Sequence, residues 1–354
     1  MSAPTFRLGP ALAAALLSGL ACAGSDDAPA RDSGYETAAA ADLPAPRTES
    51  TSFAVKFKDE VSPHPVMALF AMPGDTVPLE VVLSDTLARY VAETGGGRLE
   101  RAGSARWRWI APRRKGVFAI VVRDSASGES VALNAFVMVP RPAGTSIHGF
   151  HVGRYEPRAL RGDPAYARPR GLIEVTEENR GTFVAPHFTL GQFVSKQSGG
   201  YPKYVVLRER LLLKLEMLLE EASRQGLPVT TFRIMSGYRT PYYNQSIGNE
   251  TRYSRHLYGD AADIYVDEDG DGVMDDLDGD GRADLGDARL LAAMVERLSG
   301  SSWYRPFEGG LGLYRGTVRT DRSCTWTCGG TARGGASSRR LVAPALRLTP
   351  AAPP

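Results

Sequence analysis

The stretch Ser254-Arg-His-Leu-Tyr-Gly-Asp-Ala-Ala-Asp263 decides how the C-terminal half of this chain is interpreted. It places His256, the last of five histidines, seven residues before Asp263. Imidazole and carboxylate groups are both good zinc ligands, and Gly259 between them allows a sharp turn or a close backbone approach. We therefore predict that His256, on a loop, and Asp263, on a strand, bind one zinc ion. The alternative is a buried histidine beside a surface turn.

A second motif, Met235-Ser-Gly-Tyr-Arg-Thr-Pro241, precedes the first. Together the two motifs resemble the zinc D-alanyl-D-alanine carboxypeptidase-like metallopeptidases, which trim cell-wall peptides. The resemblance implies that Arg239 binds a substrate carboxylate or a developing oxyanion, as the planar guanidinium can do in bidentate fashion. The alternative for Arg239 is a structural salt bridge. Ser236 and Tyr238 are expected to line the pocket.

The same resemblance predicts a third zinc ligand, a histidine in an H-x-D segment near the C-terminus, and the sequence has none there. The core strand expected within 303–316 is followed by Arg322-Ser-Cys-Thr-Trp-Thr-Cys328. Read from the last base of the Ser323 codon, the codons for Cys-Thr-Trp-Thr-Cys specify an aliphatic residue or Met, then His or Tyr, then an aliphatic residue or Met, then Asp. We hypothesise that residues 317–354 are a frameshifted read, an aberrant and disordered tail. Resequencing the locus tests this.

The absent ligand affects the predicted activity. A catalytic zinc has three protein ligands and an open position for water, and the general base, which the family places near the third ligand, is unknown here. We predict a zinc-dependent peptidase that hydrolyses D-Ala-D-Ala type amides of peptidoglycan stem peptides and is impaired as written. Cys324 and Cys328 could supply thiolates or form a disulfide after export, and His187 is an alternative distant ligand. An inactive peptidoglycan-binding module and a calcium-stabilised surface protein are the other candidate functions.

An acidic stretch follows the strand that carries Asp263. Two overlapping registers of D-x-D-x-D-G begin at Asp267 and Asp276, and carboxylates alternating around a glycine turn are typical of hard-cation sites. Neither register has the bidentate Glu of a full EF-hand loop, and their overlap prevents two independent loops. The candidate calcium ligands are Asp267, Asp269, Asp271, Asp276, Asp278 and Asp280. The alternative is a solvated acidic loop.

The N-terminus has the features of an export signal. Residues 1–22 contain Arg7 followed by a short apolar core, which predicts a signal peptide of the lipoprotein type with Cys22 as the lipidated residue. That core is too short to span a bilayer as a stable helix, and no later stretch is long and apolar enough. Residues 23–50 are expected to form a flexible linker. The prediction is an exported, periplasmic or cell-surface protein held at a bacterial membrane by a lipid anchor only, with plain secretion as the alternative.

The 354 residues are enough for two folded domains. Residues 51–140 contain short strands separated by turn residues, which predicts an all-β, immunoglobulin-like sandwich. Trp107 and Trp109 share one strand face, as either a carbohydrate platform or a core and an edge residue. Residues 145–316 are predicted to be an α+β domain with a small antiparallel sheet and flanking helices, the clearest over 203–225 and the last over 288–298. The net charge of +2 implies no nucleic-acid partner.

Overall fold

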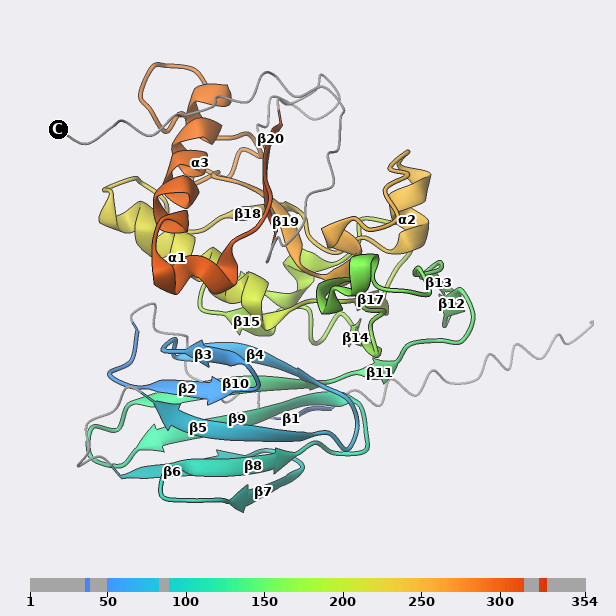
Figure 1. Ribbon diagram of the computed structural model, residues 1–354, viewed down its shortest axis with the longest axis vertical. Helices are drawn as coiled ribbons and strands as arrows, with labels where there is room; N and C mark the ends of the chain where they lie inside the picture. Colours follow the sequence, from blue (N-terminus) through green and yellow to red (C-terminus); the bar gives the residue numbers. More distant parts are fainter. Residues whose placement is uncertain (1–35, 39–49, 83–88, 315–324, 330–354) are drawn as a thin grey trace, which may run out of the picture. The chain divides into compact units, whose positions relative to one another are not determined.

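The computed structural model describes residues 36–38, 50–82, 89–314 and 325–329 (Figure 1). All of them fall in one unit, Tyr35–Pro354. The predicted signal peptide, the lipidation site Cys22 and most of the predicted linker lie outside these residues. Within the described part of the chain, no helix has the length and apolar character needed to cross a bilayer.

Two sheets make up the N-terminal part, and their apolar side chains belong to one hydrophobic core. The first sheet, in the order β3-β2-β5-β8-β7, contains β2 (Ala54–Phe57), β3 (Glu60–Ser62), β5 (Thr76–Val82), β7 (Arg98–Arg101) and β8 (Arg106–Ile110). The second, in the order β1-β9-β10-β4 with β6 also paired to β9, contains β1 (Glu36–Ala38), β4 (Val66–Ala71), β6 (Tyr90–Thr94), β9 (Gly116–Asp124) and β10 (Ser130–Val137).

Strand β8 illustrates how the sequence forms this core. Side chains alternate between the two faces of a strand, so Trp107 and Trp109 point inward and are 4% and 0% exposed. The carbohydrate-platform interpretation of these tryptophans is therefore wrong, and so is the assignment of one of them to an edge. Strand β4, which the sequence analysis did not predict, is buried at all six positions and consequently lacks an alternating pattern.

The strand order does not establish an immunoglobulin-like topology. In the second sheet, β1 pairs with β9 and β10 pairs with β4 in parallel, while the remaining pairs are antiparallel. The structure shows two sheets of short strands in the predicted 51–140 region, together with β1 from an earlier part of the chain.

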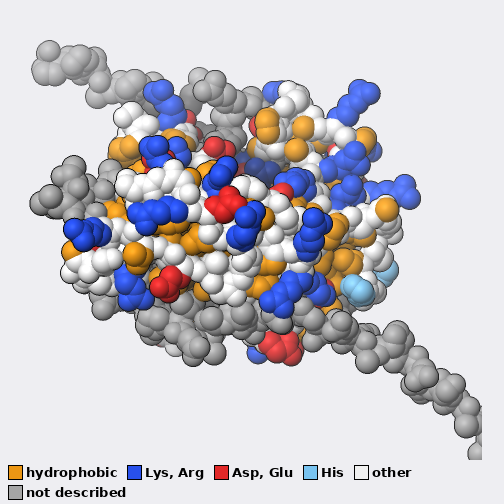
Figure 2. Space-filling model, turned by 90° about the horizontal axis from the view of Figure 1, so that it is seen from below, with side chains coloured by type: hydrophobic (Ala, Val, Ile, Leu, Met, Phe, Trp, Pro, Cys, Tyr) orange, Lys and Arg blue, Asp and Glu red, His pale blue; other side chains and the backbone are white. Residues whose placement is uncertain are grey.

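The face of the molecule in Figure 2 carries Lys and Arg side chains scattered among polar and apolar ones, with few Asp and Glu side chains. On strand β8, Arg106 and Arg108 are exposed and form ion pairs with Glu80 and Glu100 at 2.7 and 3.5 Å. Exposed pairs of this kind contribute little to stability.

The C-terminal part mixes helices with small antiparallel sheets, as predicted. Its main sheet has the order β18-β19-β21-β20, formed by β18 (Arg233–Ser236), β19 (Ala261–Tyr265), β20 (Leu311–Tyr314) and β21 (Thr325–Gly329). Its α-helices are α1 (Glu209–Arg224), α2 (Pro241–Ser246) and α3 (Leu285–Ser299), and α3 packs against α1 and β20 (Figure 1). Residues 325–329 of the predicted tail form β21, which pairs with both β19 and β20.

Smaller elements connect these parts. One sheet joins β11 (Val139–Pro140), β14 (Gly171–Val175) and β17 (Lys203–Val205), and two hairpins pair β12 (Ser146–Ile147) with β13 (Phe150–His151) and β15 (Phe183–Ala185) with β16 (Phe188–Thr189). The 3-10 helices are η2 (Leu160–Gly162), η3 (Pro164–Tyr166), η4 (Leu190–Phe193), η5 (Arg255–Tyr258) and η6 (Ser302–Phe307).

The two helix predictions differ in accuracy. Helix α1 begins at Glu209 rather than at 203, because Lys203–Val205 pairs with β14 as a strand. Helix α3 covers the whole predicted range and begins three residues earlier, at Leu285. Asp284 caps it by accepting from the Gly286 N–H. The side chains of Asp284 and Asp287 also each accept the other's backbone N–H, the reciprocal arrangement of a capping box.

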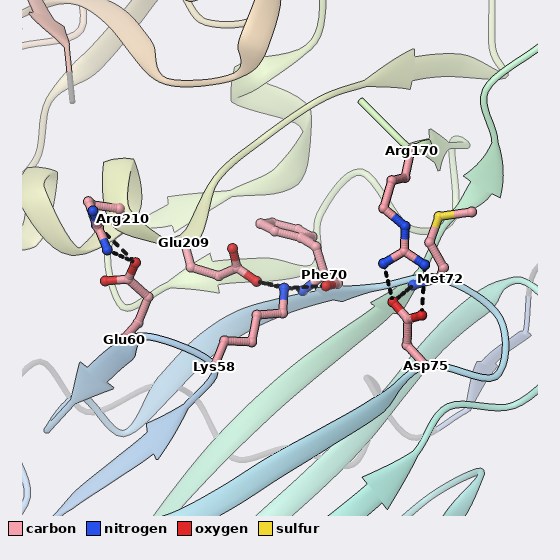
Figure 3. A network of polar contacts seen from close by, with 8 residues as sticks. All are labelled: Lys58, Glu60, Phe70, Met72, Asp75, Arg170, Glu209 and Arg210. Carbon is pink, nitrogen blue, oxygen red and sulfur yellow. Dashed lines mark hydrogen bonds and ion pairs between the residues drawn. The ribbon is translucent and has the colours of Figure 1, made fainter. Parts of the chain in front are cut away.

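The start of α1 forms polar contacts with the N-terminal part of the chain through Glu209 and Arg210 (Figure 3). The Glu209 Oε1 atom lies 2.5 Å from Lys58 Nζ and accepts the Phe70 N–H at 3.0 Å. Two further ion pairs flank it, Glu60–Arg210 and the bidentate Asp75–Arg170. Because Glu209 is 9% exposed, removing its carboxylate would leave the buried Phe70 N–H without its acceptor.

The hydrogen bond between His187 and Glu216 of α1 makes the stability of the fold depend on pH. His187 Nδ1 lies 2.6 Å from Glu216 Oε2, a carboxylate in a residue that is 2% exposed. That hydrogen bond raises the pKa of His187, so its contribution is fully present below the ordinary value of 6.5 and is lost as pH rises through the raised pKa. Burial lowers the pKa of His64, whose charge also interacts with that of His187. The effect of His64 on stability has the opposite pH dependence, because the unfolded chain binds a proton more readily and the fold therefore loses stability as pH falls below 6.5.

We expect His187→Gln to abolish the stability loss that the parent chain shows above pH 6.5 and to leave the loss below 6.5, due to His64, in place. Urea unfolding of both chains across this pH range measures the difference. Parallel curves for the two chains would contradict the assignment.

Candidate metal centre

His256 is held in a defined orientation on η5. Its Nδ1 atom lies 2.7 Å from the Gly237 carbonyl oxygen, which can only accept, so Nδ1 carries the hydrogen. The neutral ring then presents its Nε2 lone pair on the opposite side. Metal-binding histidines commonly donate their other ring N–H to a backbone carbonyl in this way, which fixes the tautomer. The residue is 6% exposed, so the orientation is also fixed by packing.

Asp263, on β19, faces that lone pair. Its Oδ1 atom lies 3.4 Å from His256 Nε2. Two ligands of a tetrahedral zinc with bonds of about 2.0–2.1 Å lie roughly 3.3 Å apart, so the pair matches one edge of such a site. Without a metal, the same separation suits an ion pair only if His256 is protonated. The donor chemistry and the spacing both fit zinc.

Arg239 occupies the other oxygen of the same carboxylate. Its Nη2 atom lies 2.5 Å from Asp263 Oδ2, and its Nε–H donates to Ser236 Oγ at 2.8 Å. The structure therefore contains the salt bridge that was the alternative interpretation of Arg239, and this contact orients Asp263 toward His256. The role of Arg239 in binding substrate stays a prediction.

Glycines allow the segments of the site to approach one another. Gly259 has φ +65°, and a Cβ atom there would lie 2.3 Å from the Val206 carbonyl oxygen. The predicted turn and close backbone approach are both present. A Cβ atom at Gly237 would lie 2.8 Å from Phe193 Cα, so the carbonyl that holds His256 depends on a residue without a side chain.

The predicted pocket residues behave differently from one another. Ser236 accepts the hydrogen bond from Arg239, whereas Tyr238 is 1% exposed and its hydroxyl lies 2.7 Å from that of Tyr155. Burial raises the pKa of Tyr238. The expectation that Tyr238 lines a pocket is therefore wrong, because its side chain is packed in the interior.

Lys196 is a cation beside the site that the sequence analysis missed. Its side chain is exposed overall, yet partial desolvation of its ammonium group is the main cause that lowers its pKa, and the charge of Arg239 lowers it further. The charge of Asp263 acts in the opposite direction. The next residue, Gln197, accepts the Thr240 hydroxyl at 2.9 Å, which sets this segment beside the one that carries Arg239. An isolated lysine in an irregular segment gives no sequence signal for this position.

The described residues supply two ligands and no third. Two groups of three potential metal ligands occur in the described part of the chain, one within the acidic loop and one formed by this loop and the start of α3, and neither contains His256. His187, the alternative ligand, has its Nδ1 engaged by Glu216. Cys324 lies outside the described residues, and Cys328 is placed in β21 opposite Ala262.

Strand β21 pairs directly with the strand that carries Asp263. It lies between β19 and β20, with Thr327 directly opposite Asp263 and Thr325 opposite Tyr314. Residues two apart on a strand share a face, so positions 325 and 327 lie on the face of the sheet that carries Asp263.

The acidic loop forms two separate groups of carboxylates, with membership that differs from the prediction. Each group has ligand atoms within 4.8 Å of one another: Asp267, Asp269 and Asp275 in one, and Asp276, Asp278 and Asp287 in the other. The predicted Asp271 and Asp280 belong to neither. Asp287 comes from the first turn of α3, and its place as position 12 of a twelve-residue loop that begins at Asp276 could have indicated it.

The comparisons with known proteins support the resemblance inferred from the motifs. Residues 170–277 match the family model described as Peptidase M15. This segment contains both motifs, including His256 and Asp263, and ends before α3, β20 and β21. No curated protein and no solved structure gives a significant match. The resemblance to zinc D-alanyl-D-alanine carboxypeptidase-like proteins is thus confirmed for this part of the chain, at the level of the family.

Proposed function

We propose that this chain is a zinc-dependent peptidase that hydrolyses D-Ala-D-Ala type amides of peptidoglycan stem peptides. We further propose that its activity is impaired because the third zinc ligand is missing. The observation that carries the proposal is the His256–Asp263 pair, with Nδ1 tied to the Gly237 carbonyl and Nε2 3.4 Å from Asp263 Oδ1. The pair lies inside the segment that matches the peptidase family. Export, lipidation at Cys22 and an immunoglobulin-like fold for residues 51–140 belong to the same proposal.

The residues of the site would have distinct roles. His256 Nε2 and Asp263 Oδ1 would hold the zinc, which when bound polarises a carbonyl and lowers the pKa of water. Arg239 fixes Asp263 through its second oxygen. Lys196 and Arg239 together place positive charge where the free carboxylate of a stem peptide would be attracted. The general base is unassigned.

The missing ligand accounts for the expected impairment. Under the frameshift hypothesis, the His and Asp of the shifted frame fall at positions 325 and 327, on the strand that pairs with β19. Zinc held by two protein ligands is bound more weakly than zinc held by three, and it lacks the usual constraint on geometry. The same lack of a third ligand among the described residues favours the second candidate, an inactive module that retains peptidoglycan peptides without cleaving them.

Zinc content and peptide cleavage measured on one preparation test the proposal. The purified chain is stripped of metal, reconstituted with zinc, and incubated with stem peptides ending in D-Ala-D-Ala. Slow, zinc-dependent release of D-Ala supports the peptidase, and peptide binding without release supports the inactive module. A chain that takes up no zinc and binds no peptide would contradict both.

A further inference from the structure

Asp267 has an unusual environment for a carboxylate. It follows β19 closely and is 5% exposed. Its Oδ2 atom lies 3.1 Å from Arg233 Nε, whereas its Oδ1 atom is buried without a hydrogen-bond partner. Buried polar atoms are nearly always partnered, and leaving one unsatisfied is costly. The orphaned oxygen therefore points to a ligand.

Two more carboxylates converge on Asp267. Ligand atoms of Asp267, Asp269 and Asp275 lie within 4.8 Å of one another. Burial raises the pKa of Asp275, and the negative charges of Asp269 and Asp267 raise it further. Like charges at this separation repel one another, and a bound cation would remove the repulsion.

We propose that Asp267, Asp269 and Asp275 bind one calcium ion, with Asp267 Oδ1 as the buried ligand. The donors are all carboxylate oxygens, with no nitrogen or sulfur among them, and such all-oxygen sites favour calcium or magnesium over zinc. Calcium accepts irregular, flexible coordination, whereas magnesium demands near-ideal octahedral geometry. The ligands come from one loop whose backbone turns at Gly270 and Gly272, with φ of +77° and +84°, and such a loop suits calcium. This inference does not rest on the proposed peptidase activity.

A bound ion would hold the loop that contains Asp269 and Asp275 against the end of β19, the strand that carries Asp263. Asp275 already lies beside the end of β19, because its N–H donates to the Val266 carbonyl at 3.0 Å and its Oδ2 accepts the Glu268 N–H at 2.7 Å. Calcium held between Asp267 and Asp275 would close this short loop at both ends. We expect the ion to act on stability, since the group it joins does not include His256.

Calcium titration of the full chain tests the site, with Asp269→Asn as the main variant. Asp269 is exposed, and its Oδ1 accepts the Asp271 N–H at 3.1 Å, a bond that asparagine preserves while losing the charge. We expect calcium alone to raise the melting temperature of the parent chain, and Asp269→Asn to weaken calcium binding by about tenfold or more. Asp267→Asn should have the same effect, and the exposed variant alone decides the matter if Asp267→Asn does not fold.

Asp280→Asn is the matched control, because it removes one exposed carboxylate of the same loop that belongs to neither group. It should leave calcium binding unchanged. The proposal is overturned if the parent chain binds no calcium at millimolar concentration, or if Asp269→Asn and Asp280→Asn behave alike. It is also overturned if Asp276→Asn, and not Asp269→Asn, abolishes binding, since that result would place the ion in the other group.

Discussion

A chain carrying Thr325→His together with Thr327→Asp is expected to bind zinc roughly 100-fold or more tightly than the parent chain. The reason is the register of β21, which places position 327 opposite Asp263 and position 325 two residues along on the same face. Diagonal neighbours across an antiparallel pair lie about 7–8 Å apart, a distance that an imidazole and a metal ion can bridge. Isothermal titration with zinc, and D-Ala release from stem peptides, measure the gain.

Trp326→His serves as the control for this experiment. It introduces the same imidazole on the same strand, but position 326 pairs with Ile264 and lies on the opposite face of the sheet. We expect no gain in zinc affinity from it. Equal gains from both histidines would show that a third ligand at position 325 is not what the site lacks.

His256→Ala is expected to have the second largest effect, a loss of most zinc from the reconstituted chain. The substitution removes the Nε2 lone pair that faces Asp263 and leaves only one ligand among the described residues. It also removes the Nδ1–H donor to the Gly237 carbonyl, so circular dichroism should first establish that the variant folds. Zinc content by mass spectrometry then gives the readout.

His151→Ala is the matched variant for this measurement. His151 is exposed on β13 and contacts Ser146 Oγ at 3.1 Å, so removing its imidazole should leave zinc content unchanged. Should His256→Ala retain as much zinc as His151→Ala, the His256–Asp263 pair would be a plain ion pair and the site assignment would fail.

Local sequence patterns predicted those strands and helices that have one face in the core and the other in solvent. Arg106–Ile110 alternates because one face of β8 meets the core and the other meets solvent. Val66–Ala71 could not be found in this way, since all six of its residues are buried. The apolar run over 204–207 is equally compatible with a strand or a helix, and the pairing of β17 with β14 shows that its first half is part of a strand.

The sequence alone determined the family resemblance and the two zinc-ligand candidates, because His256, Gly259 and Asp263 are close in sequence and their chemistry is local. Only the tertiary structure placed Arg239 on the second oxygen of Asp263, brought Lys196 near both, and put β21 beside β19. It also divided the acidic loop into two groups that include Asp275 and Asp287. These contacts depend on strand register and on burial, which are set by pairing and packing between segments that are far apart in the sequence.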